Sequence, residues 1–206
     1  MIPYGRQDIS QFDIDAVLEV LKSDFLTQGP MVPLFEQTIS THVGARHAIA
    51  VNSATAALHI ACLALELGEG DWLWTSPNTF VASANCARYC GAKVDFVDID
   101  PATYNMSVEK LAEKLALAEK EGRLPKVVVP VHFSGQSCDM AGIHKLSQQY
   151  GFKVIEDAIA ASGVNSDTNK VFKIGINCEG ESYFNKDPKD ANKYEVEGAK
   201  NQHDQD

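Results

Sequence analysis

Short apolar segments alternate with longer segments of helical periodicity along most of this chain, and this alternation restricts its possible folds more than any other feature. Expected strands are HAIAVN, WLWTS, KVDFVDI, KVVVPVH and FKVIEDA, which begin at residues 47, 72, 93, 126 and 152. Expected helices between and beside them cover residues 54–67, 79–91, 107–121 and 139–150. Apolar strands joined by helices predict an α/β fold with a mostly parallel sheet and helices on both faces.

Two further helices are expected before the first strand. Ser10 and Asp13 have the spacing of a capping box and open an amphipathic segment. The pair Gly29-Pro30 predicts a turn, and a second helix follows over residues 34–42.

The composition changes after about Gly163, where the chain becomes polar and mixed in charge and loses its periodic apolar positions. We therefore expect residues 1–163 to form one domain. Residues 164–206 are expected to be a divergent polar tail, poorly ordered or at best a strand and loops.

Charge and cysteine content exclude several classes of protein. A formal net charge of −10 over 206 residues argues against a surface for nucleic acid or anionic lipid. No apolar run has the roughly 18 residues that a membrane helix needs. The five cysteines include no C-x-x-C pair, so we expect a cytoplasmic protein without a disulfide framework or zinc ribbon. A metal shared by Cys86 and Cys90 is less expected than packing of two buried thiols.

The first expected strand runs into a helix through small residues instead of a glycine-rich loop. Ser53, Ala54 and Thr55 offer free backbone N–H groups, the positive end of a helix dipole and two hydroxyl groups, which together suit a phosphate. Taken by itself, Ser53 is better explained as an ordinary helix N-cap.

Two more strand ends carry side chains with a possible ligand role. Phe80 follows a strand at the start of a helix, where its ring could cover a flat ligand, although alone it is better explained as core. Glu156 and Asp157 end the last strand, and an acid there could pair with a protonated ring nitrogen or cap a helix. A phosphate site, a stacking aromatic and an acid match the needs of pyridoxal 5′-phosphate.

The chain resembles the sugar aminotransferases of the DegT/DnrJ/EryC1/StrS family over about residues 2–158. The matching segments are IPYGRQDI, LKSDFLTQGP, FEQ, the run from ARHAIAVNSATAALHIACLAL to FVDIDPATYNMSVEKL, LPKVVVPVHFSGQSCDM and YGFKVIEDA. The resemblance implies a pyridoxal-phosphate enzyme of fold type I, of which this chain holds a truncated large domain. It further implies a homodimer with its active site at the subunit interface.

The resemblance also implies roles for particular residues. The phosphate-binding segment of the family falls on Ser53, Ala54 and Thr55, its ring-stacking aromatic on Phe80, and its acid for the pyridine nitrogen on Asp157. The implied reaction transfers an amino group, with glutamate as the expected donor, to the keto carbon of a UDP-linked 4-keto-6-deoxy-N-acetylhexosamine.

Substrate contacts near the N-terminus are implied in the same way. They fall on Tyr4, Leu26, Thr27, Gln28 and Gly29. His132, beyond another strand end, either lines the same cleft or is a structural histidine whose hydrogen bonds are satisfied.

The match weakens after the acid. The family continues with alanine and then a Ser-His step, whereas this chain has Ala158 followed by Ile159-Ala160. The Schiff-base lysine of the family would fall on Lys189 or Lys186, but Asp and Pro surround both, and the apolar strand that precedes the lysine in the family is absent.

The alternative to an aminotransferase is therefore a non-catalytic remnant that binds phosphate or a full-length subunit. A nicotinamide-dependent oxidoreductase lacks support because no G-x-G-x-x-G follows the first strand. A sugar dehydratase with histidine in place of the lysine lacks a histidine near the required place.

Overall fold

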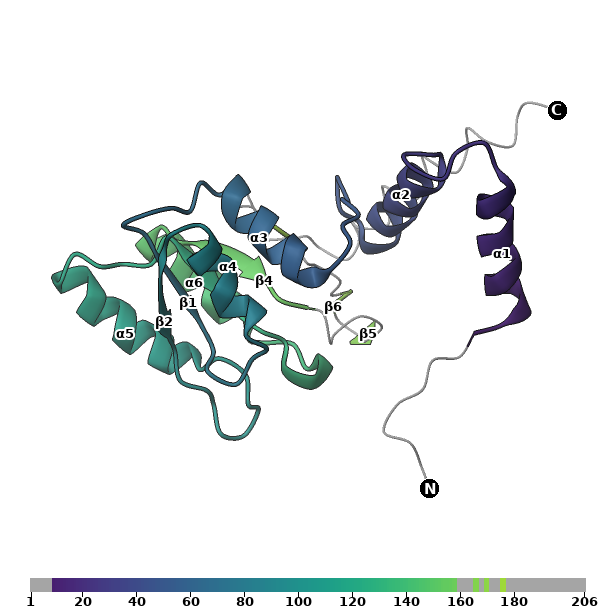
Figure 1. The fold of residues 1–206 in the computed structure, drawn as a ribbon. Coiled ribbons are helices and arrows are strands. Elements are labelled where there is room, and N and C mark those ends of the chain that lie inside the picture. The colour runs from purple at the N-terminus through teal and green to yellow at the C-terminus, as the bar shows by residue number, and fades with distance from the viewer. Residues whose placement is uncertain (1–8, 159–164, 167–168, 171–174, 177–206) are drawn as a thin grey trace, which may run out of the picture. The chain divides into compact units, whose positions relative to one another are not determined.

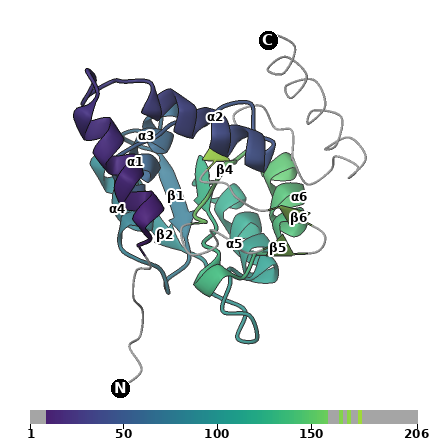
Figure 2. The ribbon, with the colours of Figure 1, turned by 90° about the vertical axis from the view of Figure 1, so that its right-hand side faces the viewer.

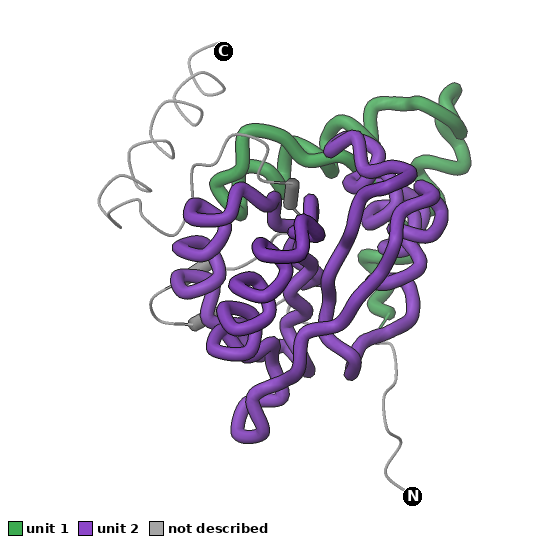
Figure 3. The backbone as a smooth tube through the Cα atoms, turned by 90° about the vertical axis from the view of Figure 1, so that its left-hand side faces the viewer, with its two compact units in different colours: residues 1–50 green, residues 51–206 purple. Residues whose placement is uncertain are grey.

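The computed structural model describes residues 9–158, 165–166, 169–170 and 175–176. The chain divides into two compact units, Met1–Ala50 and Val51–Asp206, which are shown in different colours in Figure 3. The boundary expected at residue 163 lies outside the described residues and stays a prediction. Within the described part of the chain, no helix is both long and apolar enough to cross a membrane.

The first unit contains helices α1 (Gln11–Lys22) and α2 (Met31–Val43). The capping box expected at the start of α1 is confirmed, because Ser10 Oγ accepts the N–H of Asp13 while the Asp13 carboxylate accepts the N–H of Ser10. Helix α2 starts three residues earlier than expected and ends at Gly44, which has the left-handed φ of 66° that glycine adopts without strain.

The strand expected at HAIAVN is wrong, because residues 47–52 form no strand in the described structure. The backbone N–H of Ala50 donates to the carboxylate of Glu36 at 2.8 Å instead of to a neighbouring strand. Ile49 is 77% exposed, so the apolar side chains of this segment do not mark a buried strand.

The second unit is built on a five-stranded sheet in the order β2-β1-β3-β4-β7. Strands β2, β1, β3 and β4 pair in parallel, and β7 pairs with β4 in the antiparallel direction at the edge of the sheet. The strands are β1 (Trp72–Thr75), β2 (Lys93–Phe96), β3 (Val127–Val129), β4 (Lys153–Glu156) and β7 (Gly175–Ile176). A separate antiparallel pair joins β5 (Asn165–Ser166) to β6 (Asn169–Lys170). The expected mostly parallel sheet is confirmed.

Helices cover both faces of this sheet, as expected. Figure 2 shows α3 and α4 on one side of the strands and α5 and α6 on the other (compare Figure 1). These helices are α3 (Ala54–Ala64), α4 (Ala82–Tyr89), α5 (Val108–Lys120) and α6 (Met140–Tyr150), with the short 3-10 helix η1 (Phe133–Gly135) before α6. Helix α3 ends at Ala64 rather than near Gly68, because Glu66 adopts a φ of 55°.

Alternation along the strands sends successive side chains into two different cores. On β3, Val127 and Val129 pack with α3 and α4, and Val128 between them packs with α5 and α6. A strand buried on both faces must be apolar throughout, which explains the run of three valines.

Two leucines on opposite faces of helix α5 allow a test of this layered arrangement. Leu115 is fully buried in the core beneath α5, whereas Leu117 is 58% exposed. Replacing Leu115 by Ala should lower the free energy of unfolding by about 2–5 kcal/mol, because it leaves a cavity. Leu117→Ala on the same helix should change it by less than about 0.5 kcal/mol. Urea denaturation measures both; equal effects would contradict the layering.

Candidate functional site

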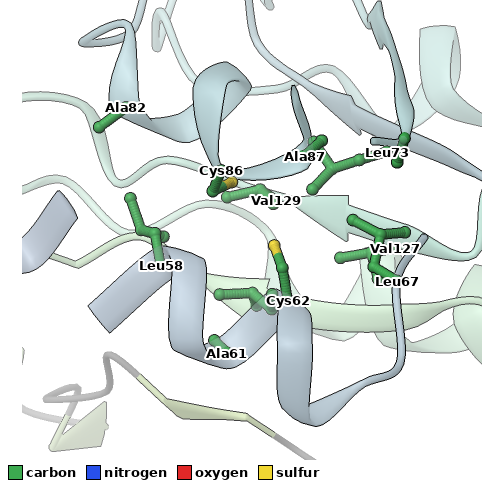
Figure 4. Close-up of a cluster of buried hydrophobic side chains, with 12 residues drawn as sticks. Leu58, Ala61, Cys62, Leu67, Leu73, Ala82, Cys86, Ala87, Val127 and Val129 are labelled. Atoms are coloured by element: carbon green, nitrogen blue, oxygen red, sulfur yellow. The ribbon is translucent and has the colours of Figure 1, made fainter. Parts of the chain in front are cut away.

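The carboxyl ends of the parallel strands form one edge of the sheet, and α3 and α4 begin at this edge. Figure 4 shows Leu58, in the second turn of α3, and Ala82, the first residue of α4, at one end of a shared core, and Leu67 with Val127 at the other. Because Val127 is the first residue of β3, the starts of both helices lie toward the carboxyl ends of the strands. Helix N-termini at such an edge are the usual ligand sites of open α/β sheets.

Asp157 directly follows β4 at this edge and is 5% exposed. Its backbone is fixed on both sides, since its N–H donates to Pro130 O at 2.9 Å and its carbonyl accepts the N–H of His132 at 3.0 Å. Its side chain accepts a hydrogen bond from Ser83 Oγ at 2.7 Å.

The Asp157 carboxylate has no cationic partner within the described part of the chain. Its neighbour Ser83 is neutral, and no described Lys, Arg or His makes an ion pair with it. Burying an unpaired charge costs free energy, which a ligand that brings a positive N–H group would offset.

The buried His132 and the partly buried Glu156 form a separate pair beside this acid. The N–H of Cys138 donates to His132 Nδ1 at 3.2 Å, so the ring proton lies on Nε2 and is donated to Glu156 Oε2 at 3.3 Å. Both nitrogens of the fully buried ring are therefore engaged. His132 is the structural histidine that the sequence left as one of two interpretations.

Three of the described cysteines, Cys62, Cys86 and Cys138, are buried packing groups. Burial raises the pKa of the Cys138 thiol to about 12, so it is uncharged at neutral pH. Cys62 and Cys86 face each other in the core between α3 and α4 (Figure 4), and their hydrogen bond raises the pKa of Cys62. Among the described residues, no group of three or more His, Cys, Asp or Glu side chains is placed to hold a metal ion.

At the start of α3, one polar side chain caps the helix and three other polar groups lack a partner among the described residues. Ser53 Oγ accepts the N–H of Ala56 at 3.2 Å, so the N-cap interpretation of this side chain is correct. The N–H groups of Ala54 and Thr55 have no acceptor within the helix. The Thr55 hydroxyl has no hydrogen-bond partner among the residues that the structure describes. These three groups can bind an anion.

Phe80 lies between β1 and α4 with its side chain 72% exposed. The interpretation of this aromatic as a core residue is therefore wrong, since the core beneath α4 is filled by smaller residues such as Ala82 and Cys86. Its backbone is held by Ser83, whose N–H donates to Phe80 O at 3.1 Å.

Ser83 connects two of the residues singled out from the sequence. It contacts the carboxylate of Asp157 through its hydroxyl and the carbonyl of Phe80 through its N–H. Thr55 lies in the first turn of the neighbouring helix α3 at the same edge. Sequence reasoning missed Ser83; a serine and a threonine four residues apart after a strand, at 79 and 83, were the available signal.

The residues expected to contact substrate lie in the first unit or outside the described residues. Tyr4, Lys186 and Lys189 fall outside them. The four residues Leu26 to Gly29 form the turn between α1 and α2, where Gln28 has a φ of 53° and Leu26 is 65% exposed. At Gly29 a Cβ atom would lie 2.7 Å from Phe25 Cβ, so only glycine fits this turn.

A hollow of about 410 Å³ lies elsewhere in the second unit, lined by parts of residues 100–109 and by residues 137–139. It includes none of the residues discussed above as ligand-binding candidates. Two of its three acids, Asp100 and Asp139, accept backbone N–H groups in local turns and caps, which accounts for their presence; the third is Glu109 in the first turn of α5.

The fold defines a class: an open α/β domain with a mostly parallel sheet and helices on both faces. The particular family follows from sequence. Residues 7–188 match the model of the DegT/DnrJ/EryC1/StrS aminotransferase family, and the chain belongs to that family.

Individual relatives agree with this assignment. The chain is 44% identical to the spore coat polysaccharide biosynthesis protein SpsC of Bacillus subtilis, over 78% of this chain and 40% of that protein. It is 38% identical to the UDP-4-amino-4-deoxy-L-arabinose–oxoglutarate aminotransferase of Shewanella sediminis, over 84% of this chain and 43% of the relative. The chain thus spans about two fifths of the length of these relatives.

A solved structure shows the same fold. NtdA from Bacillus subtilis, with its bound cofactor PMP, superposes with a TM-score of 0.68 and 34% identity, over 74% of this chain and 34% of NtdA.

Asp157 is buried without a cationic partner among the described residues, whereas Asp71 is partly buried and paired with Lys126, so substitutions of the two can be compared. Replacing Asp157 by Asn should raise the free energy of unfolding by about 1 kcal/mol at pH 7, because it removes a buried charge that has no cationic partner. A decrease of more than about 1 kcal/mol would show that this acid serves the fold.

Asp71 is the control, because Lys126 Nζ donates to its carboxylate at 2.9 Å and holds the pKa of Asp71 below its ordinary value of 3.8. Asp71→Asn should lower the free energy of unfolding by up to about 1 kcal/mol at pH 7, since the pair is partly exposed. A carboxyl group whose pKa is lower in the folded than in the unfolded protein stabilises the fold fully only when the pH is above its unfolded pKa. The difference in unfolding free energy between the parent and Asp71→Asn should therefore shrink as the pH falls below about 4. Urea denaturation at several pH values measures both variants.

Proposed function

We propose that this chain is the cofactor-binding part of a sugar-nucleotide aminotransferase that uses pyridoxal 5′-phosphate. The observation that carries the proposal is the buried carboxylate of Asp157, which lacks a cationic partner among the described residues, in a chain that belongs to this aminotransferase family. PMP, the cofactor of the related NtdA, is the amine form of pyridoxal phosphate.

The donor set at the strand edge suits this cofactor. Asp157 would accept the N–H of the protonated pyridine ring, and the exposed face of Phe80 would pack against the ring. The N–H groups of Ala54 and Thr55, with the Thr55 hydroxyl, would bind the phosphate at the positive end of α3. When bound, pyridoxal phosphate supplies an electron-withdrawing ring that stabilises negative charge on the substrate carbon.

For the substrate, we propose a UDP-linked 4-keto-6-deoxy-N-acetylhexosamine with glutamate as amino donor. From the resemblance of the sequence, we propose the reaction of the UDP-4-amino-4,6-dideoxy-N-acetyl-β-L-altrosamine transaminase of pseudaminic acid biosynthesis. The Shewanella sediminis relative, named for a UDP-linked amino sugar, supports this substrate class. Tyr4 and the turn from Leu26 to Gly29 are the proposed substrate contacts. We further propose a homodimer, as the resemblance implies, and a cytoplasmic location, which the cysteine content favours.

Turnover also needs a lysine, for which Lys189 is the candidate. A second function, binding without turnover, is favoured by one observation: Ile159-Ala160 stands where the family has a Ser-His step. Such a chain would hold the cofactor or a full-length subunit and transfer no amino group.

Cofactor binding tests the phosphate and ring contacts separately. Titration with pyridoxal phosphate, followed by tryptophan fluorescence, should give saturable binding that is at least about tenfold tighter than binding of pyridoxal, which lacks the phosphate. Thr55→Val should reduce that preference, because it removes a hydroxyl hydrogen bond to a charged group worth about 1.5–3 kcal/mol. Phe80→Ala should weaken both ligands about equally.

Thr38→Val, on the exposed surface of α2, is the control and should bind like the parent. Equal affinity of the parent for pyridoxal and its phosphate would contradict the proposed phosphate site. Borohydride reduction and mass spectrometry then separate the two functions: label on Lys189 or Lys186 supports an aminotransferase, and bound cofactor without a labelled lysine supports binding alone.

A further inference from the structure

Two hydroxyl groups form a short chain that ends on Asp157. Thr79 Oγ1 lies 2.8 Å from Ser83 Oγ, and Ser83 Oγ lies 2.7 Å from Asp157 Oδ2. Ser83 is fully buried, so its hydroxyl must satisfy its hydrogen bonds within the protein.

The direction of these hydrogen bonds follows from counting protons. A carboxylate only accepts, so the single proton of Ser83 is donated to Asp157, and the Thr79 hydroxyl must then donate to Ser83. The carbonyl of Phe80, 3.2 Å from Ser83 Oγ, is a longer alternative for the serine proton. That carbonyl already accepts the N–H of Ser83 at 3.1 Å and needs no second donor.

This arrangement leaves the two carboxylate oxygens of Asp157 unequal. Oδ2 is occupied by Ser83, whereas Oδ1 has no hydrogen-bond partner among the described residues. The backbone of Asp157 is held between Pro130 and His132, so the remaining freedom of the residue is rotation of its side chain. The hydrogen bond from Ser83 removes that freedom and selects the oxygen that stays open.

We propose that Ser83 is a positioning residue for cofactor binding, which fixes the Asp157 side chain so that Oδ1 faces the ring nitrogen, with Thr79 orienting the serine proton. This inference rests on the proposed function. The same serine holds the Phe80 carbonyl, so a single residue sets the acid and the backbone of the stacking aromatic together.

A purely structural role is the competing explanation. Serine in a first helical turn often hydrogen-bonds a carbonyl three residues earlier, and Ser83 does lie within reach of Phe80 O. In that case its loss would loosen the whole edge and weaken every ligand there. In the proposed case its loss affects only ligands that carry a ring N–H.

The experiment compares pyridoxal phosphate with 1-deazapyridoxal 5′-phosphate, in which carbon replaces the ring nitrogen. Binding of both to the full chain is measured by fluorescence titration. Ser83→Ala should weaken the binding of pyridoxal phosphate about tenfold, because it removes a hydrogen bond to a charged group. The affinity for the deaza analogue should stay within about twofold of that of the parent. Ser83→Thr, which keeps the hydroxyl, should retain most of the parent affinity.

Two further variants complete the design. Thr79→Val should weaken the binding of pyridoxal phosphate by about threefold, because it removes one hydrogen bond between neutral groups, and should leave binding of the deaza analogue unchanged. This variant replaces Ser83→Ala in the test if Ser83→Ala does not fold. Ser147→Ala, on α6 beyond the opposite face of the sheet, should bind both ligands like the parent.

The outcomes separate this inference from the proposed function. Equal weakening of both ligands in Ser83→Ala and Thr79→Val, or parent affinity in both variants, overturns the role of Ser83 while the cofactor assignment stands. A parent chain that binds neither ligand overturns both.

Discussion

Parallel pairing of β1, β3 and β4 is the constraint on which the rest of the second unit depends. It brings the carboxyl ends of these strands to one edge and sends the connecting helices back to start there. Asp157 continues this pairing beyond β4 through a bridge to Val131, which places its side chain at the edge. The side chain then meets Ser83 in the first turn of α4. Strand register therefore determines where the acid lies, and one helix determines how it is oriented.

The electrostatic consequence is a buried acid without a cationic partner among the described residues, which in the proposed function gains that partner when the cofactor binds. Asp71 shows the ordinary arrangement at the opposite end of β1, where Lys126 compensates an acid within the fold. Asp157 is more buried and has only a neutral hydroxyl as side-chain partner. Such a difference between two aspartates of one domain is typical of a fold that gives up some stability for a binding site.

The sequence predicted the parts of this structure that depend on local periodicity. The capping box of Ser10 and Asp13, the layered α/β fold and the helices on both faces were all readable from residue spacing. The segment HAIAVN was misread, because alternation cannot reveal whether a neighbouring strand exists to pair with it. Phe80 was misread in isolation because an aromatic among apolar residues does not show which way its side chain points. Only its position after a strand, together with the resemblance, indicated a ligand.

Ser83 shows what residue patterns leave out. Its partner Asp157 lies 74 positions further along the chain, and only the folded sheet brings the two together. The roles implied for Ser53, Ala54, Thr55, Phe80 and Asp157 remain proposals, although the structure links two of them through this serine. The residues proposed for substrate and for the catalytic lysine belong to other parts of the chain, so their roles rest on the resemblance alone.

The proposed cofactor site depends on the Asp157 carboxylate complementing a protonated ring nitrogen. Pyridoxal phosphate labelled with nitrogen-15 in its ring, bound to the protein and observed by NMR at neutral pH, tests this directly. The parent should show the signal of a protonated ring nitrogen, and Asp157→Asn that of an unprotonated one. The same protonation state in both proteins would contradict the account.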